Sequence, residues 1–271
     1  MKTYTRATPA PWTTLGHRLA SVPSTNALLH ERAQSAARAG APLPLGTSLR
    51  AGVQTAGRGR HARTWEGADG LNLYVSYLLD GAGLTAARLF ALSQALALGV
   101  RDAVAALTPG HEAQVKYPND VYLDGGKVAG LLVEASLAGE HPLYVVAGVG
   151  LNVNQLDFAS APAATSLRAA TAHAFDLPET WATLTRKLQV AYVTLAAAAE
   201  TGDFDRISHR YHEHLFQLGD WGNYRRTTDG HILRARLRGV SEAGLLTLEH
   251  DGGEHYYAMD EVRYLPTSGL L

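Results

Sequence analysis

The segment from Gly57 to Trp65, GRGRHARTW, carries three arginines, Arg58, Arg60 and Arg63, within six residues. A guanidinium group binds a carboxylate or phosphate through two parallel hydrogen bonds. The glycines at 57 and 59 let the backbone come close to a ligand. The segment therefore predicts an anion-binding loop, although a solvated basic loop explains this short stretch about equally well.

The same letters also match the dinucleotide-binding pattern G-x-G-x-x-G/A. In dinucleotide-binding proteins this pattern follows a strand and opens an apolar helix. Here a strand-like run at 71–79, LNLYVSYLL, follows after a few residues, so the required helix is missing. We therefore disfavour a nicotinamide-dependent oxidoreductase, an alternative that tight NAD binding would restore.

A second group of charged residues lies in KYPND (116–120) and the GGKVAG segment that follows. Pro118 favours an extended Tyr117, so Lys116 leaves the end of a strand and Asn119 and Asp120 sit at its bend. Lys127 follows a tight turn. Adenylyl transfer needs fixed cations around developing negative charge, and these lysines can join the arginine loop around one triphosphate. Taken singly, each lysine is more often a solvated surface charge.

A third segment, GVGLNVN (148–154), places Gly148 and Gly150 inside an apolar strand. Glycine at such positions indicates the close approach of a ligand or helix, or else a bulge.

The surrounding elements must position these residues. Ser24 or Thr25 can cap a helix that ends near Gly40. Residues 1–20 predict an extended lead-in. Hydrophobic periodicity predicts strands at 47–54, 71–79, 113–118, 121–124, 127–136 and 143–153, and helices at 85–107, 178–199 and 203–217. Asp124-Gly125-Gly126 supplies a hairpin turn.

From Gly219 onward the sequence pattern changes to short strand-like runs separated by glycine-containing turns. This pattern predicts a small β-barrel of about fifty residues. We place a domain boundary near residue 218, which gives domains at 1–218 and 219–271.

The composition limits the classes of function. Lys and Arg number 24 against 25 Asp and Glu, so the strongly basic character typical of nucleic-acid-binding proteins is absent. A nucleic-acid-binding module built on the C-terminal barrel would need a steep, salt-dependent affinity for DNA. The absence of cysteine excludes thiolate catalysis and suits a reducing cytoplasm. The sequence start lacks an apolar targeting region, and we expect no membrane association.

In this order and spacing, Ser24-Thr25-Asn26, GRGRHARTW, LNLYVS, KYPNDVYL, GGKVAGLLVE and GVGLNVN resemble the biotin protein ligase family over about residues 17–265. The resemblance implies an α+β fold, with a class II aminoacyl-tRNA synthetase-like catalytic domain, a mixed sheet with helices, and a small C-terminal SH3-like β-barrel. It implies an enzyme that forms biotinyl-5'-AMP from biotin and ATP with Mg²⁺. The enzyme then transfers biotin to a lysine of a biotin carboxyl carrier protein of acetyl-CoA carboxylase.

The resemblance also implies roles for individual residues. The catalytic cations are Arg58, Arg60, Lys116 and Lys127. The residues expected to bind biotin and the adenylate are Ser24, Thr25, Asn26, Gln54, Gly57, Arg58, Gly59, Arg60, Trp65, Asn119, Asp120, Lys127, Gly130 and Asn152. Trp65 is expected to pack the arginine loop shut, and Mg²⁺ is held mainly by the ATP phosphates. Ala62, where the family often has glycine, and Tyr117, where tryptophan is common, are mild departures.

Several further expectations follow. Only about 23 residues precede Ser24, too few for the DNA-binding domain that some members carry, so we expect a monofunctional ligase that does not bind DNA. A lipoate–protein ligase is the nearest alternative. An exposed sheet edge could pair with a second copy of the chain to form a homodimer. The cluster His209, His212, Glu213 and His214 lacks an H-E-x-x-H pattern, so we expect an exposed polar helix end rather than a metal site.

Overall fold

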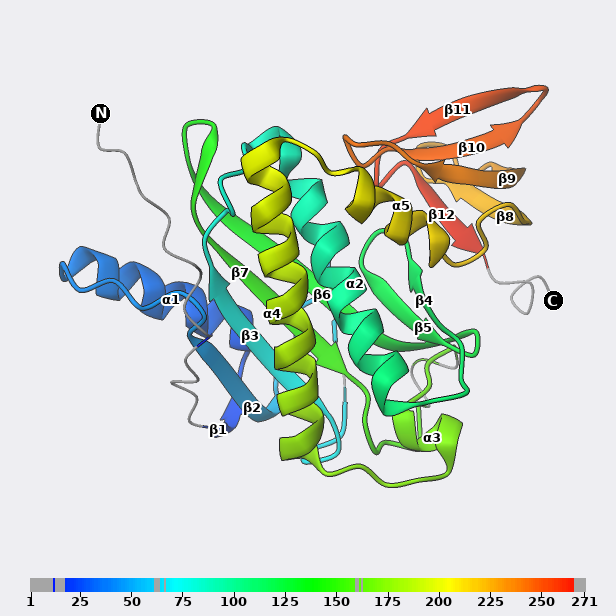
Figure 1. Cartoon of the computed structure of the whole chain (residues 1–271). Helices are drawn as coiled ribbons and strands as arrows, with labels where there is room; N and C mark the ends of the chain where they lie inside the picture. Colours follow the sequence, from blue (N-terminus) through cyan, green and yellow to red (C-terminus); the bar gives the residue numbers. More distant parts are fainter. Residues whose placement is uncertain are drawn as a thin grey trace.

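The computed structural model describes residues 12, 18–60, 64–65, 67–158, 161 and 163–265. Its centre is a seven-stranded mixed sheet, and a smaller five-stranded sheet packs at one end (Figure 1). The large sheet has the strand order β1-β2-β3-β7-β6-β5-β4. Its strands are β1 (Arg18–Val22), β2 (Ser48–Gln54), β3 (Leu73–Leu79), β4 (Ala113–Lys116), β5 (Asp120–Leu123), β6 (Gly126–Ala138) and β7 (His141–Leu151).

Among the described strands of the large sheet, β1 and β2 pair in parallel and all other neighbours are antiparallel. β5 and β6 are joined by the expected tight turn, in which Asp124 and Gly125 both have positive φ (48° and 80°). Two consecutive residues with positive φ are what a type I′ hairpin turn requires. The turn brings Lys127 to the start of β6, beside β5.

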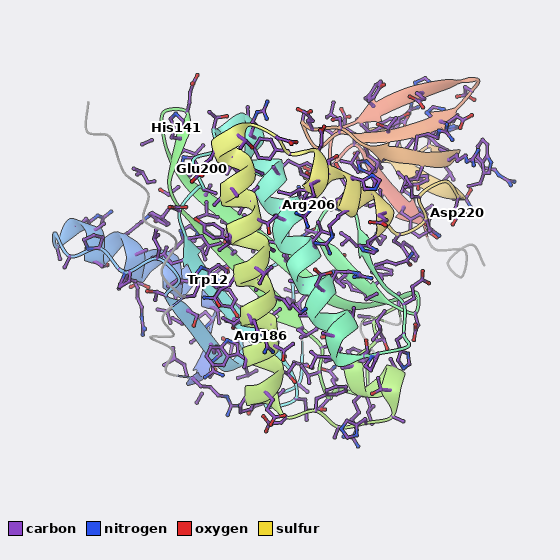
Figure 2. All side chains as sticks on the ribbon, viewed as in Figure 1. Trp12, His141, Arg186, Glu200, Arg206 and Asp220 are labelled. Carbon is purple, nitrogen blue, oxygen red and sulfur yellow. The ribbon has the colours of Figure 1, made fainter. Side chains whose placement is uncertain are left out.

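Two long helices cover one face of the large sheet, α2 (Leu89–Leu107), which follows the short 3₁₀ turn η1 (Ala86–Arg88), and α4 (Leu177–Thr201). The stretch Ala86–Leu107 is long and apolar enough to cross a membrane, but most of it is buried as a core helix against α4 and the sheet. Trp12 packs on the same side, with its ring 5.2 Å from that of Tyr77 and 5.8 Å from that of Tyr192 (Figure 2).

Helix α1 (Thr25–Arg38) lies on the opposite face, against β2, β3 and β7. Ser24 caps it, because its side chain accepts a hydrogen bond from the Ala27 N–H. Side chains alternate between the faces of a strand, so Val145, Ala147 and Val149 of β7 face α2 and α4, whereas Gly148 and Gly150 face the α1 side. Gly148 and Gly150 therefore lie on the face of the sheet opposite the two long helices.

The smaller sheet has the order β11-β10-β9-β8-β12 and is entirely antiparallel. Its strands are β8 (Trp221–Arg226), β9 (Ile232–Val240), β10 (Leu246–His250), β11 (Gly253–Tyr257) and β12 (Val262–Leu265). Helix α5 (Asp205–Glu213) leads into it, and α3 (Leu167–Thr171) precedes α4. The segment after α5 pairs with the edge strand β4, since Val115 N–H donates to the His214 carbonyl and Phe216 N–H donates to the Val115 carbonyl.

The mixed sheet with helices and the C-terminal antiparallel β-structure confirm the expected fold class. Three elements differ from the sequence expectation. Residues 18–22 form strand β1 where only a lead-in was expected, α3 was not expected, and the smaller sheet has a further strand, β12. The division into domains at residue 218 stays a prediction.

Candidate active site

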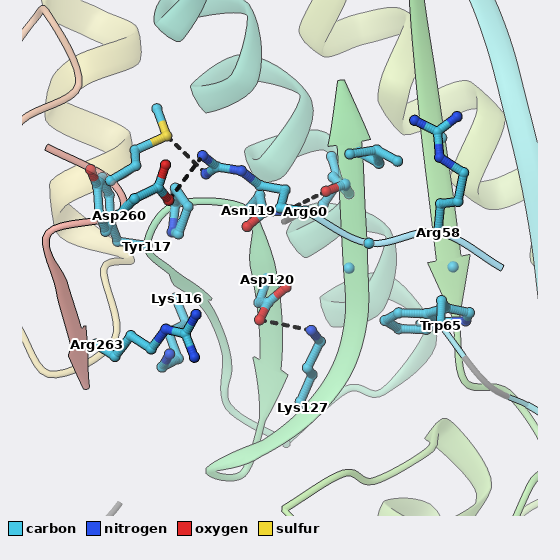
Figure 3. Close-up of a pocket in the computed structure, with 18 of the residues that line it drawn as sticks. Arg58, Arg60, Trp65, Lys116, Tyr117, Asn119, Asp120, Lys127, Asp260 and Arg263 are labelled. Carbon is cyan, nitrogen blue, oxygen red and sulfur yellow. Dashed lines mark hydrogen bonds and ion pairs between the residues drawn. The ribbon is translucent and has the colours of Figure 1, made fainter. Parts of the chain in front are cut away.

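A cavity of about 440 Å³ lies on the glycine-bearing face of the large sheet and continues to the smaller sheet (Figure 3). It is lined by residues from the start of α1, the arginine segment, strands β5 to β7 and the C-terminal sheet. Of the residues expected from sequence, it brings together Ser24, Thr25, Asn26, Gln54, Arg58, Gly59, Arg60, Trp65, Lys116, Asn119, Asp120, Lys127 and Gly130.

The start of α1 forms an uncharged, hydrogen-bonded part of the cavity wall. The Gln54 Oε1 atom accepts from the backbone N–H of Thr25 at 2.7 Å and lies 3.1 Å from the Thr25 hydroxyl. Ser76 Oγ lies 2.8 Å from Thr25 Oγ1 and 2.6 Å from Asn26 Oδ1. Because Ser24, Thr25, Asn26 and Ser76 are all buried, these bonds fix their side chains in one arrangement.

Glycines on β6 and β7 make room for two side chains at the cavity. A Cβ on Gly148 would lie 2.2 Å from Asn26 Oδ1. A Cβ on Gly150 would lie 2.4 Å from the Trp65 ring, and one on Gly130 would lie 2.7 Å from it. The close approach expected at Gly148 and Gly150 is therefore made by a residue of α1 and by the tryptophan of the arginine segment.

The two described arginines of the segment are held by carboxylates from different elements. Arg58 donates from Nη2 to Glu134 of β6. Arg60 donates from Nη1 to the Met259 sulfur at 2.8 Å, and its Nη2 lies 3.7 Å from the Asp260 carboxylate. Arg63 and Ala62 lie outside the described residues.

Lys127 and Asp120 form an ion pair of 2.8 Å inside the cavity, and the Lys127 ammonium lies 5.2 Å from the centre of the Trp65 ring. Asn119 donates from its amide to the Leu131 carbonyl, which fixes the bend after β4. The Lys116 ammonium lies over the rings of Tyr122 and Tyr264, at 5.6 and 5.5 Å. The lysines of KYPND and GGKVAG therefore reach one cavity, as their spacing predicted.

The C-terminal sheet supplies a wall that sequence reasoning missed. Met259, Asp260, Arg263 and Tyr264 all line the cavity. The Tyr117 hydroxyl, whose pKa burial raises well above its ordinary range, donates to the Gly244 carbonyl at 2.6 Å and joins this sheet to β4. No local motif marks these residues, because they meet the cavity only through the packing of the two sheets.

Two residues expected at the site do not line the cavity. The Asn152 side chain is buried and donates to the Thr165 carbonyl at 3.0 Å, so it supports the loop after β7. Gly57 packs against the backbone of Trp65, where a Cβ would lie 2.2 Å from the Trp65 carbonyl oxygen. The Gly57 carbonyl accepts a hydrogen bond from the Trp65 N–H at 2.9 Å, which joins the first and last residues of the arginine segment.

His212 is not on an exposed helix end, contrary to the sequence expectation. Its Nε2 accepts from the Val240 N–H at 2.9 Å and its Nδ1 donates to the Ser208 carbonyl at 2.8 Å. This histidine therefore joins α5 to β9 with both ring nitrogens. Among the described residues no group of three or more His, Cys, Asp or Glu is placed to hold a metal ion.

Comparisons with known proteins agree with the site geometry. The Biotin/lipoate A/B protein ligase family matches residues 22–152. A biotin–[acetyl-CoA-carboxylase] ligase of Paracoccus denitrificans is 34% identical over 218 residues, covering 77% of this chain and 86% of the relative. A ligase of the same description from Mycobacterium tuberculosis is 41% identical over 151 residues, which span 55% of this chain and 53% of that relative.

The fold is also shared with a biotin protein ligase from Aquifex aeolicus in complex with biotin and ATP. The TM-score is 0.74 at 25% identity, and the superposition covers 93% of this chain and 99% of the other. These relatives and structures favour the biotin branch of the family over the lipoate alternative. The chain belongs to the Biotin/lipoate A/B protein ligase family and, within it, to the biotin protein ligases.

Proposed function

We propose that the protein activates biotin with ATP to form biotinyl-5'-AMP and then transfers the biotinyl group to a lysine of an acceptor protein. One observation carries this proposal. Cations from separate segments, Arg58 and Arg60, Lys116, and Lys127, line one cavity together with the uncharged network around Thr25 and Gln54. Such a cavity suits a ligand with a neutral, hydrogen-bonding ring at one end and an acyl-phosphate at the other.

In the first step an oxygen of the biotin carboxylate attacks the α-phosphorus of ATP. The bond to the β-phosphate breaks and pyrophosphate leaves. Both reactants are anionic, so fixed cations must offset their repulsion, and we assign this role to Lys116, Lys127, Arg58 and Arg60. Their main contributions are positioning and electrostatic stabilisation.

In the second step the neutral amine of the acceptor lysine attacks the carbonyl carbon of the mixed anhydride. The bond from that carbon to the phosphate oxygen breaks, AMP leaves, and the amine loses its proton. The network of Thr25, Gln54, Ser76 and Asn26 would hold the neutral ring of biotin in both steps. The ring of Trp65 would cover the activated carboxyl group and help to exclude water.

We also propose that Mg²⁺ enters with the ATP phosphates. Mg²⁺ in nucleotide sites takes one or two protein carboxylates and completes its ligand set with phosphates and water. Asp120 is a carboxylate inside the cavity, and Asn119 stands beside it, so these residues fit that mode of binding. The ion would neutralise charge on the leaving pyrophosphate.

We take the acceptor to be a biotin carboxyl carrier protein, because the relatives are described as biotin–[acetyl-CoA-carboxylase] ligases. A cytoplasmic location is part of this proposal. Strand β1 is an edge of the large sheet and is the place where a homodimer would form.

The proposal is tested by biotin-dependent ATP–pyrophosphate exchange on the purified protein, with lipoate as the alternative substrate. We expect exchange with biotin only, whereas exchange with lipoate only would contradict the proposal. Lys127→Met should lower the rate by at least about tenfold, since it removes a charge-assisted contact to the reacting group. Lys187→Met, the same substitution on α4 and away from the cavity, should leave the rate unchanged.

A further inference from the structure

Glu134 has no place in the two steps above, yet it joins two parts of the site. It lies on β6 on the same face as Gly130 and Leu132, and about a quarter of its side chain is exposed. Its Oε1 accepts from the Arg58 guanidinium, and its Oε2 accepts from the Asn26 amide at 2.9 Å. One carboxylate therefore holds both an arginine of the GRGR segment and the residue at the start of α1.

Asn26 extends this connection into the uncharged network. Its amide also donates to the Leu132 carbonyl at 3.1 Å, and its Oδ1 accepts from Ser76. Ser76 in turn lies 2.8 Å from the Thr25 hydroxyl. A continuous chain of hydrogen bonds thus runs from Arg58 through Glu134 and Asn26 to the hydroxyl groups that we propose bind the biotin ring.

Arg58 is the cationic partner of the Glu134 carboxylate. The nearest other cationic candidate is His30 of α1, whose Nε2 lies 4.0 Å from Glu134 Oε2. Burial lowers the pKa of His30 by more than the neighbouring Glu134 carboxylate raises it, and Arg58 lowers it further, so the net shift disfavours the charged imidazole. The Glu134–Arg58 contact is then a charge-assisted hydrogen bond, whose direction is fixed at the carboxylate end by Asn26.

We propose that Glu134 is a positioning residue for the ligase reaction, which orients the Arg58 guanidinium toward the adenylate by holding it to the Asn26–Ser76–Thr25 network. The inference rests on the proposed function, because it assigns Arg58 to the adenylate. Glu134 itself would touch neither biotin nor ATP. Arg58 is about half exposed, so without this carboxylate its long side chain would sample many rotamers in solvent.

Glu134→Gln separates positioning from structural support. Glutamine keeps an oxygen for the Asn26 amide but presents an NH₂ group to Arg58, so only the guanidinium contact is lost. We expect kcat/KM for biotin-dependent exchange to fall by about tenfold, the size of one charge-assisted hydrogen bond that is partly exposed. Glu140→Gln, in the exposed turn after β6, is the matched control and should behave as the wild type.

A double-mutant cycle then decides how Glu134 acts. If it acts through Arg58, Glu134→Gln should lower kcat/KM by less than about twofold when introduced into an Arg58→Gln background. Independent structural damage would instead multiply the two losses. A second full tenfold loss in that background, or no loss in the single variant, would overturn the proposal.

A ligand-free readout keeps the inference distinguishable from the proposed function. Limited digestion with trypsin should cleave faster after Arg58 in Glu134→Gln than in the wild type or in Glu140→Gln, because the unheld arginine is free to enter the protease. Equal cleavage rates would refute the Arg58–Glu134 contact whatever the enzyme's substrate is. Absence of biotin-dependent exchange in the wild type would refute the ligase function, and the digestion would still decide the contact.

Discussion

Gly150 determines where the Trp65 ring can lie in the cavity. Its missing side chain leaves room for the Trp65 ring, which a Cβ would approach to 2.4 Å. Trp65 in turn lies beside the Lys127 ammonium, at 5.2 Å from ring centre to nitrogen. The position of one of the proposed catalytic cations thus depends on the absence of a methyl group on β7.

We therefore expect Gly150→Ala to lower the rate of biotin-dependent exchange by more than about tenfold, while the midpoint of thermal unfolding changes little. A displacement near one ångström at a positioned group costs a factor of this order. Gly253→Ala is the control, because a Cβ there meets only an ordinary van der Waals contact at 3.9 Å. A fully active Gly150→Ala would show that Trp65 does not need this position.

His30 should make the stability of the protein depend on pH. Burial lowers its folded-state pKa below the usual 6.5, so between these two values the unfolded chain binds more protons than the folded one. The stabilisation is present above pH 6.5 and is lost as pH falls toward the folded-state pKa. We expect the urea midpoint to fall between pH 7 and pH 5, and to fall less in His30→Gln. Equal losses in both proteins would exclude His30 as the cause.

At the scale of the elements, local rules read from the sequence were accurate where neighbouring residues decide the structure. The Ser24 cap and the turn at Gly125 are both present. The sequence RLASV alone does not predict strand β1. This strand forms because it pairs in parallel with β2, which lies about thirty residues further along the chain. The pairing partner, rather than the five residues themselves, supplies its hydrogen bonds.

The contact between α2 and α4 also depends on a glycine. A Cβ on Gly99 would lie 3.0 Å from the Ala191 Cβ and 3.2 Å from the Leu188 Cα. Gly99→Val should therefore overpack this interface and lower the free energy of unfolding by about 1–3 kcal/mol. Exchange activity at 25 °C should remain, because these helices cover the face of the sheet away from the cavity. Denaturation with urea measures the first effect, and unchanged stability would contradict it.

At the scale of the whole molecule, the cavity is formed by both sheets. Its N-terminal and central residues could be predicted, since each lies in a compact motif with recognisable chemistry. Met259, Asp260, Arg263 and Tyr264 could not, because their place depends on how the second sheet packs on β4 and on the Tyr117–Gly244 hydrogen bond. Asn152 was assigned to the cavity because it shares the GVGLNVN motif, but its side chain turns to the Thr165 carbonyl.

Substitution of Arg263 would test whether the smaller sheet takes part in nucleotide binding. It lines the same cavity as Lys116, so we expect Arg263→Gln to raise the KM for ATP by about threefold to tenfold with little change in the KM for biotin. Arg234→Gln, on β9 of the same sheet and exposed, is the matched control. Equal effects of both substitutions would indicate a general change in charge rather than a contact with ATP.

The pairing of β12 with β8 also has a consequence for synthesis. The residues that line the cavity run from Ser24 to Tyr264, so a chain emerging from the ribosome can complete the large sheet well before the cavity has its last wall. During that interval Trp65, Lys116 and the floor of the cavity stand open to solvent and to other proteins. We therefore expect the cavity to be complete only after β12, the last strand in the described part of the chain, has been made.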